Sequence, residues 1–235
     1  MVFNEFKGKS ILITGGSSGI GRALALKMEA SGALVWVISV NREEFRELPP
    51  AIHCLEADIR EEEQVVSAVR RVREGAGRID MLVNAAGVSL WKELTEMDAA
   101  FWDLVFDVNV KGTFLVTREV ARDMINRGSG LIINVASMSG LKSGMPGASA
   151  YMASKWAVVG LSRNLHLELK KHGIRVGCIC PGSTLTDIHK KANTPMQEEM
   201  MEPGDIADSI MFMLAAQGKG HVQLLAQPAF FEEWK

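Results

Sequence analysis

The feature that most restricts the fold of this chain is a regular alternation of short apolar runs with longer helical patterns. The apolar runs have the length of buried strands, and they span residues 10–14, 33–40, 51–58, 78–87, 131–137, 174–180 and 221–227. Helical periodicity fills the stretches between them, chiefly residues 22–32, 60–75, 97–126 and 151–171 and a segment that opens at Pro203. Strands that alternate with helices form a parallel sheet covered on both faces. We therefore predict a three-layer, doubly wound α/β fold.

The length and composition indicate one globular domain. At 235 residues, without a linker or repeat, residues 1–235 are predicted to form a single domain. A net charge of −2 without a basic block argues against nucleic acid as a partner. No apolar run approaches the roughly 20 residues that span a bilayer, and the N-terminus lacks the pattern of a signal peptide. We expect a cytoplasmic protein without a membrane partner.

A glycine-rich turn stands between the first predicted strand and the first predicted helix. The turn reads TGGSSGIG, with Thr14, Gly15, Gly19 and Gly21 in the spacing T-G-x-x-x-G-x-G. A strand, a glycine turn and a helix in this order present backbone amides and a helix N-terminus to a phosphate group. The start of the chain therefore predicts a nucleotide-binding site.

Tyr151 and Lys155 stand four residues apart at the start of a predicted helix, so both side chains share one face. A nearby ammonium favours the phenolate, which predicts a tyrosine pKa lowered from about 10 toward neutral pH. Such a tyrosine can donate and accept a proton. Tyr151 is also the only tyrosine in the sequence.

The cysteines and histidines give no sign of a metal site. Cys178 and Cys180 are two apart in a predicted strand and should point to one face as small core residues, and with Cys54 they fit a reducing compartment. No histidine has zinc-finger spacing to them, and His166 and His189 are given no chemical role.

Five separated motifs occur in an order and spacing that resemble the short-chain dehydrogenase/reductase family over nearly the whole chain. They are TGGSSGIG (14–21), Asp58, NAAG (84–87), Ser137 followed by YMASK (151–155), and PGSTLT (181–186). The resemblance implies a Rossmann fold with a seven-stranded parallel sheet. It also implies a nicotinamide dinucleotide held across the carboxyl ends of the strands.

Carried over by motif, the resemblance implies that Asn109, Ser137, Tyr151 and Lys155 form the catalytic group. Tyr151 would be the general acid in reduction and the base in oxidation, and Ser137, with Ser139 as a nearby competitor, would hydrogen-bond the substrate oxygen. Lys155 would lower the tyrosine pKa and bind the nicotinamide ribose. Asn109 would hold a water that passes protons to the lysine.

The resemblance also implies a set of cofactor contacts in addition to Tyr151 and Lys155. They are Gly15, Ser17, Ser18, Gly19, Ile20, Gly21, Ser39, Asn41, Arg42, Asp58, Ile59, Asn84, Ala85, Gly87, Pro181, Gly182, Thr184 and Thr186. An acidic residue at the end of the second strand selects NAD, whereas a nearby Arg accommodates the 2′-phosphate of NADP. No carboxylate stands at 39–41 and Arg42 follows, which favours NADP(H) over NAD(H). Glu43, Glu44 and the non-basic Ser18 weaken that preference, and both cofactors remain open.

The predicted function is an NAD(P)(H)-dependent oxidoreductase that interconverts a carbonyl and a secondary alcohol on a small to medium, partly apolar substrate. Loops 88–96, 138–150 and 183–202 would shape the pocket. The alternatives are an epimerase or dehydratase, for which the chain is short, and a dinucleotide sensor or scaffold. Against the sensor stands the intact set of Ser137, Tyr151 and Lys155.

Two further segments, one rich in methionine and one rich in aromatic residues, allow predictions about packing and assembly. Met196, Met200 and Met201 belong either to the core or to an apolar lid over the substrate. Phe230, Phe231 and Trp234 gather near the terminus and should not sit unpaired in water. We predict a homodimer or homotetramer, with the helices at 97–126 and 151–171 as one shared surface and the aromatic tail as another.

Overall fold

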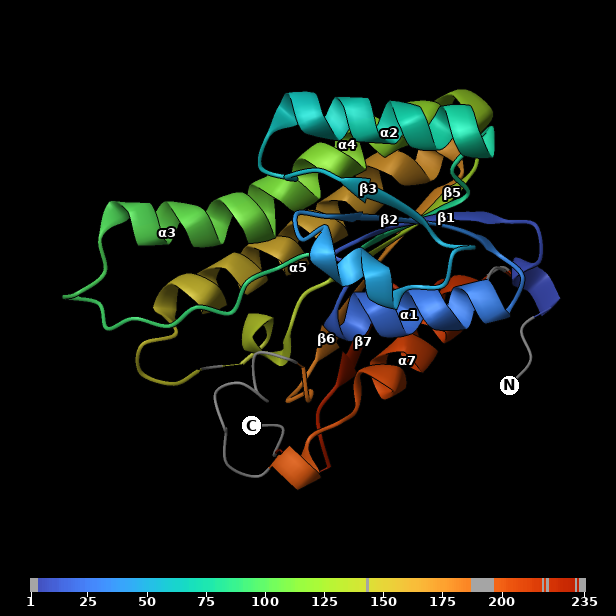
Figure 1. Cartoon of the computed structure of the whole chain (residues 1–235). Coiled ribbons are helices and arrows are strands. Elements are labelled where there is room, and N and C mark those ends of the chain that lie inside the picture. The colour runs from blue at the N-terminus through green and yellow to red at the C-terminus, as the bar shows by residue number, and fades with distance from the viewer. Residues whose placement is uncertain are drawn as a thin grey trace.

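The chain folds around one seven-stranded sheet in which every pair of neighbouring strands is parallel, as seen in a computed structural model (Figure 1). The structure describes residues 4–142, 144–186, 197–216, 218, 220–230 and 232. The strands are β1 (Ser10–Thr14), β2 (Leu34–Ser39), β3 (His53–Glu56), β4 (Met81–Asn84), β5 (Gly130–Val135), β6 (Ile174–Pro181) and β7 (Leu224–Gln227). Their order is β3-β2-β1-β4-β5-β6-β7. The predicted fold class is confirmed.

Helices cover both faces of the sheet (Figure 1). On one face lie α1 (Gly19–Ala30) and α7 (Pro203–Ala215), and on the other lie α2 (Glu62–Ala76), α4 (Thr113–Arg127) and α5 (Ser149–Leu169). A shorter helix, α3 (Ala99–Phe106), projects beyond the sheet and joins α4 through a π-helix at Asp107–Gly112. Among the described residues, no helix combines the length and apolarity needed to cross a bilayer.

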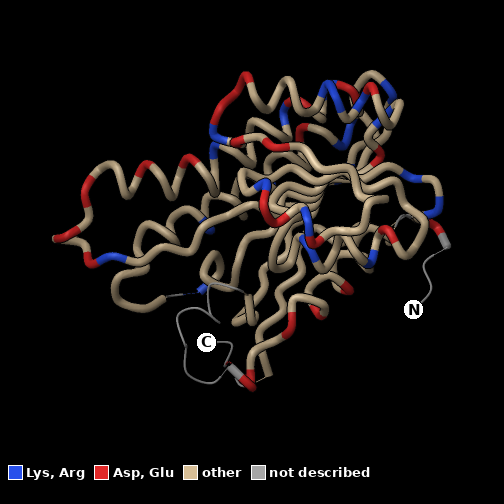
Figure 2. Tube along the Cα trace, viewed as in Figure 1, with Lys and Arg blue, Asp and Glu red and all other residues tan. Residues whose placement is uncertain are grey.

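Two apolar layers hold the helices to the sheet because strand residues alternate between its faces. Ile11 and Ile13 of β1 pack under α1 and α7 with Met28 and Ile210, whereas Leu12 joins the layer under α2, α4 and α5. Lys, Arg, Asp and Glu gather on the outer helices and loops (Figure 2), and α2 carries both signs, with acidic residues in its first turn and arginines in its second half. The strands therefore read as continuous apolar runs, the pattern of a sheet buried on both faces.

The predicted strands at 51–58 and 78–87 are too long at both ends, because β3 is His53–Glu56 and β4 is Met81–Asn84. The chain leaves the sheet after Glu56 and after Asn84, and the backbone N–H groups of Ala85 and Ala86 donate to the carbonyl and the hydroxyl of Thr14, the last residue of the neighbouring strand β1. The first helix begins at Gly19, earlier than its apolar pattern suggests. Three of these departures from the apolar pattern lie at the carboxyl end of the sheet, where the chain turns: after β3, after β4 and at the start of α1.

Strand order reverses between β1 and β4, since β2 lies on one side of β1 and β4 on the other. The connections after these strands consequently diverge to opposite faces and leave a crevice at the carboxyl ends. Such a switch point is where open α/β sheets bind ligands.

Candidate active site

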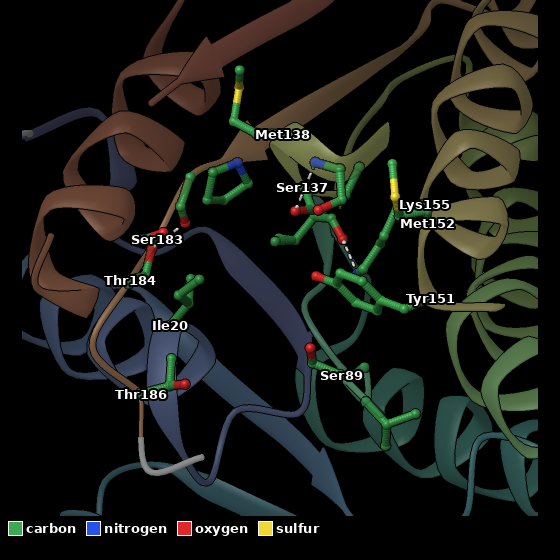
Figure 3. A pocket seen from close by; sticks show the side chains of 18 of the residues that line it. Ile20, Ser89, Ser137, Met138, Tyr151, Met152, Lys155, Ser183, Thr184 and Thr186 are labelled. Atoms are coloured by element: carbon green, nitrogen blue, oxygen red, sulfur yellow. Dashed lines mark hydrogen bonds between the residues drawn. The ribbon is translucent and has the colours of Figure 1, made fainter. Parts of the chain in front are cut away.

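A cavity of about 560 Å³ opens at the carboxyl ends of the strands. The glycine turn forms one wall, the residues after β4 and β5 with the start of α5 form the second, and the loop after β6 forms the third. Figure 3 shows Tyr151, Lys155 and Ser137 on one side of this pocket, with Ile20, Thr186 and Thr184 on the other. The lining includes these residues of the predicted site: Gly15, Ser18, Gly19, Ile20, Gly21, Ala85, Gly87, Ser137, Tyr151, Lys155, Pro181, Gly182, Thr184 and Thr186.

The glycine turn is shaped by close backbone contacts. A Cβ atom on Gly15, whose φ is +64°, would lie 2.7 Å from the Ala86 Cα atom. A Cβ atom on Gly21 would lie 2.8 Å from the Gly15 carbonyl carbon. Within the described chain, the N-cap residue Ser18 makes no side-chain hydrogen bond to the amides of α1. These amides are the donors that a phosphate group would require, so the turn fits a dinucleotide.

Ser137 and Lys155 are both fixed by backbone groups near the end of β5. The Ser137 hydroxyl accepts a hydrogen bond from the Ser139 N–H at 3.1 Å, which leaves its own proton available. Lys155 Nζ donates to the Val135 carbonyl at 3.2 Å and lies 5.8 Å from the centre of the Tyr151 ring. Gly140 allows this arrangement, because a Cβ atom there would lie 2.7 Å from the Lys155 carbonyl oxygen.

Asn109 lies in the π-helix and is 1% exposed. Its Oδ1 accepts from the Val88 N–H at 2.8 Å, and its Nδ2 donates to the Val88 carbonyl at 3.0 Å and to Ser154 Oγ at 2.9 Å. The Ser154 hydroxyl in turn donates to the Tyr151 carbonyl at 2.6 Å. Asn109 therefore ties the loop after β4 to the first turn of α5. Sequence reasoning missed Ser154, although this residue stands inside the YMASK motif.

Ser17, Ser39, Asn41 and Glu44 form a separate polar cluster at the end of β2, outside the lining of the cavity. Glu44 Oε2 accepts from the Ser17 hydroxyl at 2.5 Å, and Oε1 accepts from Asn41 Nδ2 at 2.8 Å. The Ser17 and Ser39 hydroxyls are 2.8 Å apart, and the Asn41 N–H donates to Ser39 Oγ at 3.2 Å. Because a carboxylate only accepts, Ser17 gives its proton to Glu44 and Ser39 donates to Ser17. Glu43 is adjacent to Glu44 in the sequence but does not join this cluster. It is exposed and forms an ion pair with Arg46.

Asp58 and Ile59 lie beyond this cluster, after β3. The Arg60 guanidinium binds both oxygens of Asp58, and these hydrogen bonds hold the pKa of the Asp58 carboxyl below its usual range. The Ile59 side chain is buried against Gly112, where a Cβ atom would lie 2.5 Å from the Ile59 Cδ1 atom. Arg42 is exposed at the start of the short helix Glu43–Glu47.

Asn84 lies beneath the cavity floor rather than in its lining. Its Nδ2 donates to Thr117 Oγ1 and to Asn134 Oδ1, each at 2.8 Å. Asn134 Nδ2 in turn donates to Ser162 Oγ at 2.9 Å. This buried polar chain links β4 and β5 to α4 and α5. Gly87 lies above it, and a Cβ atom there would lie 3.1 Å from Asn109 Oδ1 and 3.4 Å from Lys155 Nζ.

The predicted methionine set is divided in the structure. Met200 lines the cavity, whereas Met201 packs against the core and exchanges backbone hydrogen bonds with the loop after β6. Met196, His189, Phe231 and Trp234 lie outside the described residues, and Phe230 is fully exposed. All three predicted pocket loops contribute to the lining, which includes Val88, Ser89, Trp91, Met138, Ser139, Lys142, Gly144, Met145, Ala148, Ser183 and Met200. The lining also contains Glu232, which sequence reasoning missed.

The cysteine prediction is confirmed for the β6 pair. Cys178 and Cys180 are buried among apolar side chains beside Val158 and Val159, and Cys54 is also a free thiol. A hydrogen bond with Cys178, together with burial, raises the pKa of the Cys180 thiol above its usual range. His166 stacks on His221 at 4.8 Å, and burial with the neighbouring imidazole lowers the pKa of His166. None of these side chains is in the lining of the cavity, although Cys178 and Cys180 pack behind the lining residues Ala136 and Met138.

Comparison with known proteins gives a consistent result. A family model described as short chain dehydrogenase matches residues 9–197. Levodione reductase of Leifsonia aquatica is 37% identical over 211 residues, which cover 86% of this chain and 76% of the relative. The 3-oxoacyl-[acyl-carrier-protein] reductase FabG of Thermotoga maritima is 34% identical over 225 residues, which cover 89% of this chain and 91% of the relative.

Solved structures agree over the same length. A structure of ElxO with NADP bound superposes with a TM-score of 0.84 and 29% sequence identity, and the match covers 94% of this chain and 97% of that one. The similarity thus covers most of the chain.

Proposed function

Because this chain belongs to the short-chain dehydrogenase family and is an oxidoreductase, we propose that it interconverts a carbonyl and a secondary alcohol at the cavity beside Tyr151. The observation that carries the proposal is the joint placement of Tyr151, Ser137 and Lys155 on one wall, opposite the glycine turn. A nicotinamide dinucleotide supplies or accepts the hydride. The protein supplies the alignment and the proton.

The residues of the second wall divide the proton chemistry between them. Tyr151 donates its phenolic proton to the substrate oxygen in reduction and accepts one in oxidation. The Ser137 proton, left available by the Ser139 N–H, stabilises the charge that grows on that oxygen. Lys155 holds a buried positive charge beside the phenol and also meets the cofactor ribose. Asn109 keeps the loop and the helix in register, and a proton relay through water beside it is part of the proposal.

The cavity lining supports a partly apolar substrate of small to medium size. Its substrate end is bordered by Trp91 and by the methionines Met138, Met145, Met152 and Met200. Flexible thioethers adapt to apolar groups of different shape, and the volume lies in the range of small-molecule sites. We also propose that residues 1–235 act as one domain, since all described strands belong to one sheet. Cytoplasmic location stays a prediction.

The direct test is a screen of carbonyl compounds with reduced cofactor and of alcohols with oxidised cofactor, followed by nicotinamide absorbance. We expect turnover with apolar ketones or secondary alcohols. A chain that binds the dinucleotide tightly and turns over no member of a broad panel would instead support the sensor or scaffold alternative.

NADP(H) is the cofactor that we propose in preference to NAD(H). Support comes from the exposed Arg42, the lack of an acidic residue at 39–41, and the relative with NADP bound. Glu44 opposes this preference, because its carboxylate accepts hydrogen bonds from Ser17 and Asn41, two of the predicted cofactor contacts. Binding of a 2′-phosphate therefore requires Glu44 to turn away, whereas a 2′-hydroxyl does not.

Glu44→Gln should tighten NADP binding by about tenfold and change NAD binding little, because it removes one charge of the same sign from the 2′-phosphate site. Dissociation constants for both cofactors, measured by calorimetry, provide the test. Glu43→Gln is the matched control, since Glu43 is a neighbouring carboxylate that pairs with Arg46 at the surface.

Arg42→Ala should weaken NADP relative to NAD in the same assay. This description of the pocket would be contradicted if the wild type binds NAD as tightly as NADP and if neither Glu44→Gln nor Arg42→Ala changes the ratio of the two dissociation constants.

We further propose a homodimer or homotetramer through α3, α4 and α5. Trp102 stacks on Phe106, and Trp102, Phe114 and Trp156 are between 40% and 51% exposed. Val105, Leu115 and Val159, apolar residues of the same helices, are buried within the chain and do not belong to this surface. Light scattering at micromolar concentration should give a mass of two or four chains, and Trp156→Glu should reduce it. A monomeric wild type would contradict the proposal.

A further inference from the structure

A carboxylate from the end of the described chain forms part of the candidate pocket. Glu232 Oε1 accepts hydrogen bonds from the Ser183 hydroxyl at 2.8 Å and from the Ser183 N–H at 3.3 Å. Its Oε2 accepts from the Ala229 N–H at 2.9 Å. Ala229 is 1% exposed, so this turn is anchored in the protein. The carboxylate is thereby held against the loop that follows β6.

The loop and the turn fit together because residue 182 is glycine. A Cβ atom on Gly182 would overlap the Glu232 carboxylate and would lie 2.9 Å from the Ala229 nitrogen. The Gly182 N–H also donates to the Gln227 carbonyl at 2.8 Å, which continues the pairing of β6 with β7. Glu232 is therefore placed by several contacts of the folded chain.

The geometry points to a role for Glu232 at the nicotinamide end of the pocket. We infer that it is a positioning residue that holds the loop at Gly182–Ser183, and that its charge favours the oxidised, positively charged nicotinamide over the reduced form. This inference rests on the proposed function, since it requires a nicotinamide dinucleotide in the cavity.

The two ends of the cavity fix which wall the nicotinamide must follow. The phosphates belong at the glycine turn, and the reacting ring belongs beside Tyr151 and Ser137. The loop after β6 spans these two ends. It begins beside Ser137, because β6 pairs with β5, the strand that leads to Ser137. It then reaches the glycine turn at Thr186, since a Cβ atom on Gly19 would lie 3.3 Å from Thr186 Cγ2. Figure 3 shows Ser183 and Thr184 across the pocket from Tyr151.

The charges around the cavity give Glu232 its effect. Among the described residues that line it, Lys142 and Lys155 are cations and Glu232 is the one carboxylate. Two cations alone disfavour a positively charged ring. A carboxylate on the adjacent wall offsets that repulsion for the oxidised ring and has little effect on the neutral, reduced ring.

The test compares wild type, Glu232→Gln and Glu232→Asp in calorimetric binding of the oxidised cofactor, the reduced cofactor and ADP-ribose, which lacks the nicotinamide. If NADP binds more tightly than NAD, ADP-ribose that carries a 2′-phosphate is used in place of ADP-ribose. Glu232→Gln should weaken the oxidised cofactor by about tenfold and the reduced cofactor by less than about twofold. Binding of ADP-ribose should not change, and Glu232→Asp should restore part of the preference. Phe230→Ala is the matched control, because its side chain leaves the same turn toward solvent.

Equal weakening of both redox forms, or no change in either, would overturn the inference. If Glu232→Gln folds poorly, Ser183→Ala removes one donor to the carboxylate and should move the ratio of the two dissociation constants in the same direction by a smaller factor. A wild type that binds ADP-ribose but neither nicotinamide form would refute the proposed function instead.

Discussion

Replacing Tyr151 with Phe is expected to abolish turnover while leaving cofactor binding nearly unchanged. The substitution removes one oxygen and keeps the ring that borders Lys155. Loss of a general acid–base group lowers the rate by about 10²–10⁴-fold. Turnover on a substrate found in the screen gives the rate, and quenching of tryptophan fluorescence by the cofactor gives its affinity.

The result separates catalysis from binding because the glycine turn, on the opposite wall, holds the phosphates in the proposal. A Tyr151→Phe variant with a rate near that of wild type would remove Tyr151 from the mechanism. Ser137→Ala tests the same wall independently, and it should lower the rate without affecting the affinity for the cofactor.

Gly21→Ala is expected to cause the largest loss of cofactor affinity. A Cβ atom at position 21 would press on the Gly15 carbonyl group, and Gly15 itself lies so near Ala86 that a Cβ atom there would be 2.7 Å from the Ala86 Cα atom. The turn must therefore shift and carry its amides away from the phosphates. The loss of one charge-assisted hydrogen bond, worth about 1.5–3 kcal/mol, weakens binding by about ten- to 100-fold.

The same overpacking should lower the free energy of unfolding by about 1–3 kcal/mol. Gly160→Ala is the matched control, because nothing lies within 4 Å of a Cβ atom at that exposed position in α5. Alanine in a helix interior should raise stability there by up to about 1 kcal/mol. Denaturant unfolding of both variants measures the free energy of unfolding, and cofactor titration measures the affinity. Unchanged affinity in Gly21→Ala would contradict the assignment of the phosphate site.

The fold was predictable because its main signals are local. The central strands are runs such as SILIT in β1 and MLVN in β4, whose burial on both faces removes the need for polar alternation. The catalytic candidates were also predictable, since Tyr151 and Lys155 lie one helical turn apart and the glycine turn joins two adjacent elements. These features depend on neighbours in the sequence and not on distant contacts.

Contacts between distant segments escaped prediction. Glu44 and Glu43 are adjacent in the sequence, and only the folded backbone turns one toward Ser17 and the other toward Arg46. Glu232 reaches the cavity because β7 pairs with β6, a pairing that no local pattern encodes. Asn109 looks like an ordinary helical residue until the π-helix brings it to Val88.

The π-helix at Asp107–Gly112 also makes this site sensitive to chain length. A π-turn contains one residue more than the α-helical turns around it. Deleting a single residue there would leave an uninterrupted α-helix from α3 through α4, and the wider turn that presents Asn109 would be lost. The amide of Asn109 would then swing away from Val88 and Ser154. The extra residue thus widens one turn and places one polar side chain while the helix continues on either side, and deletions in this segment should be tolerated far less than substitutions on its surface.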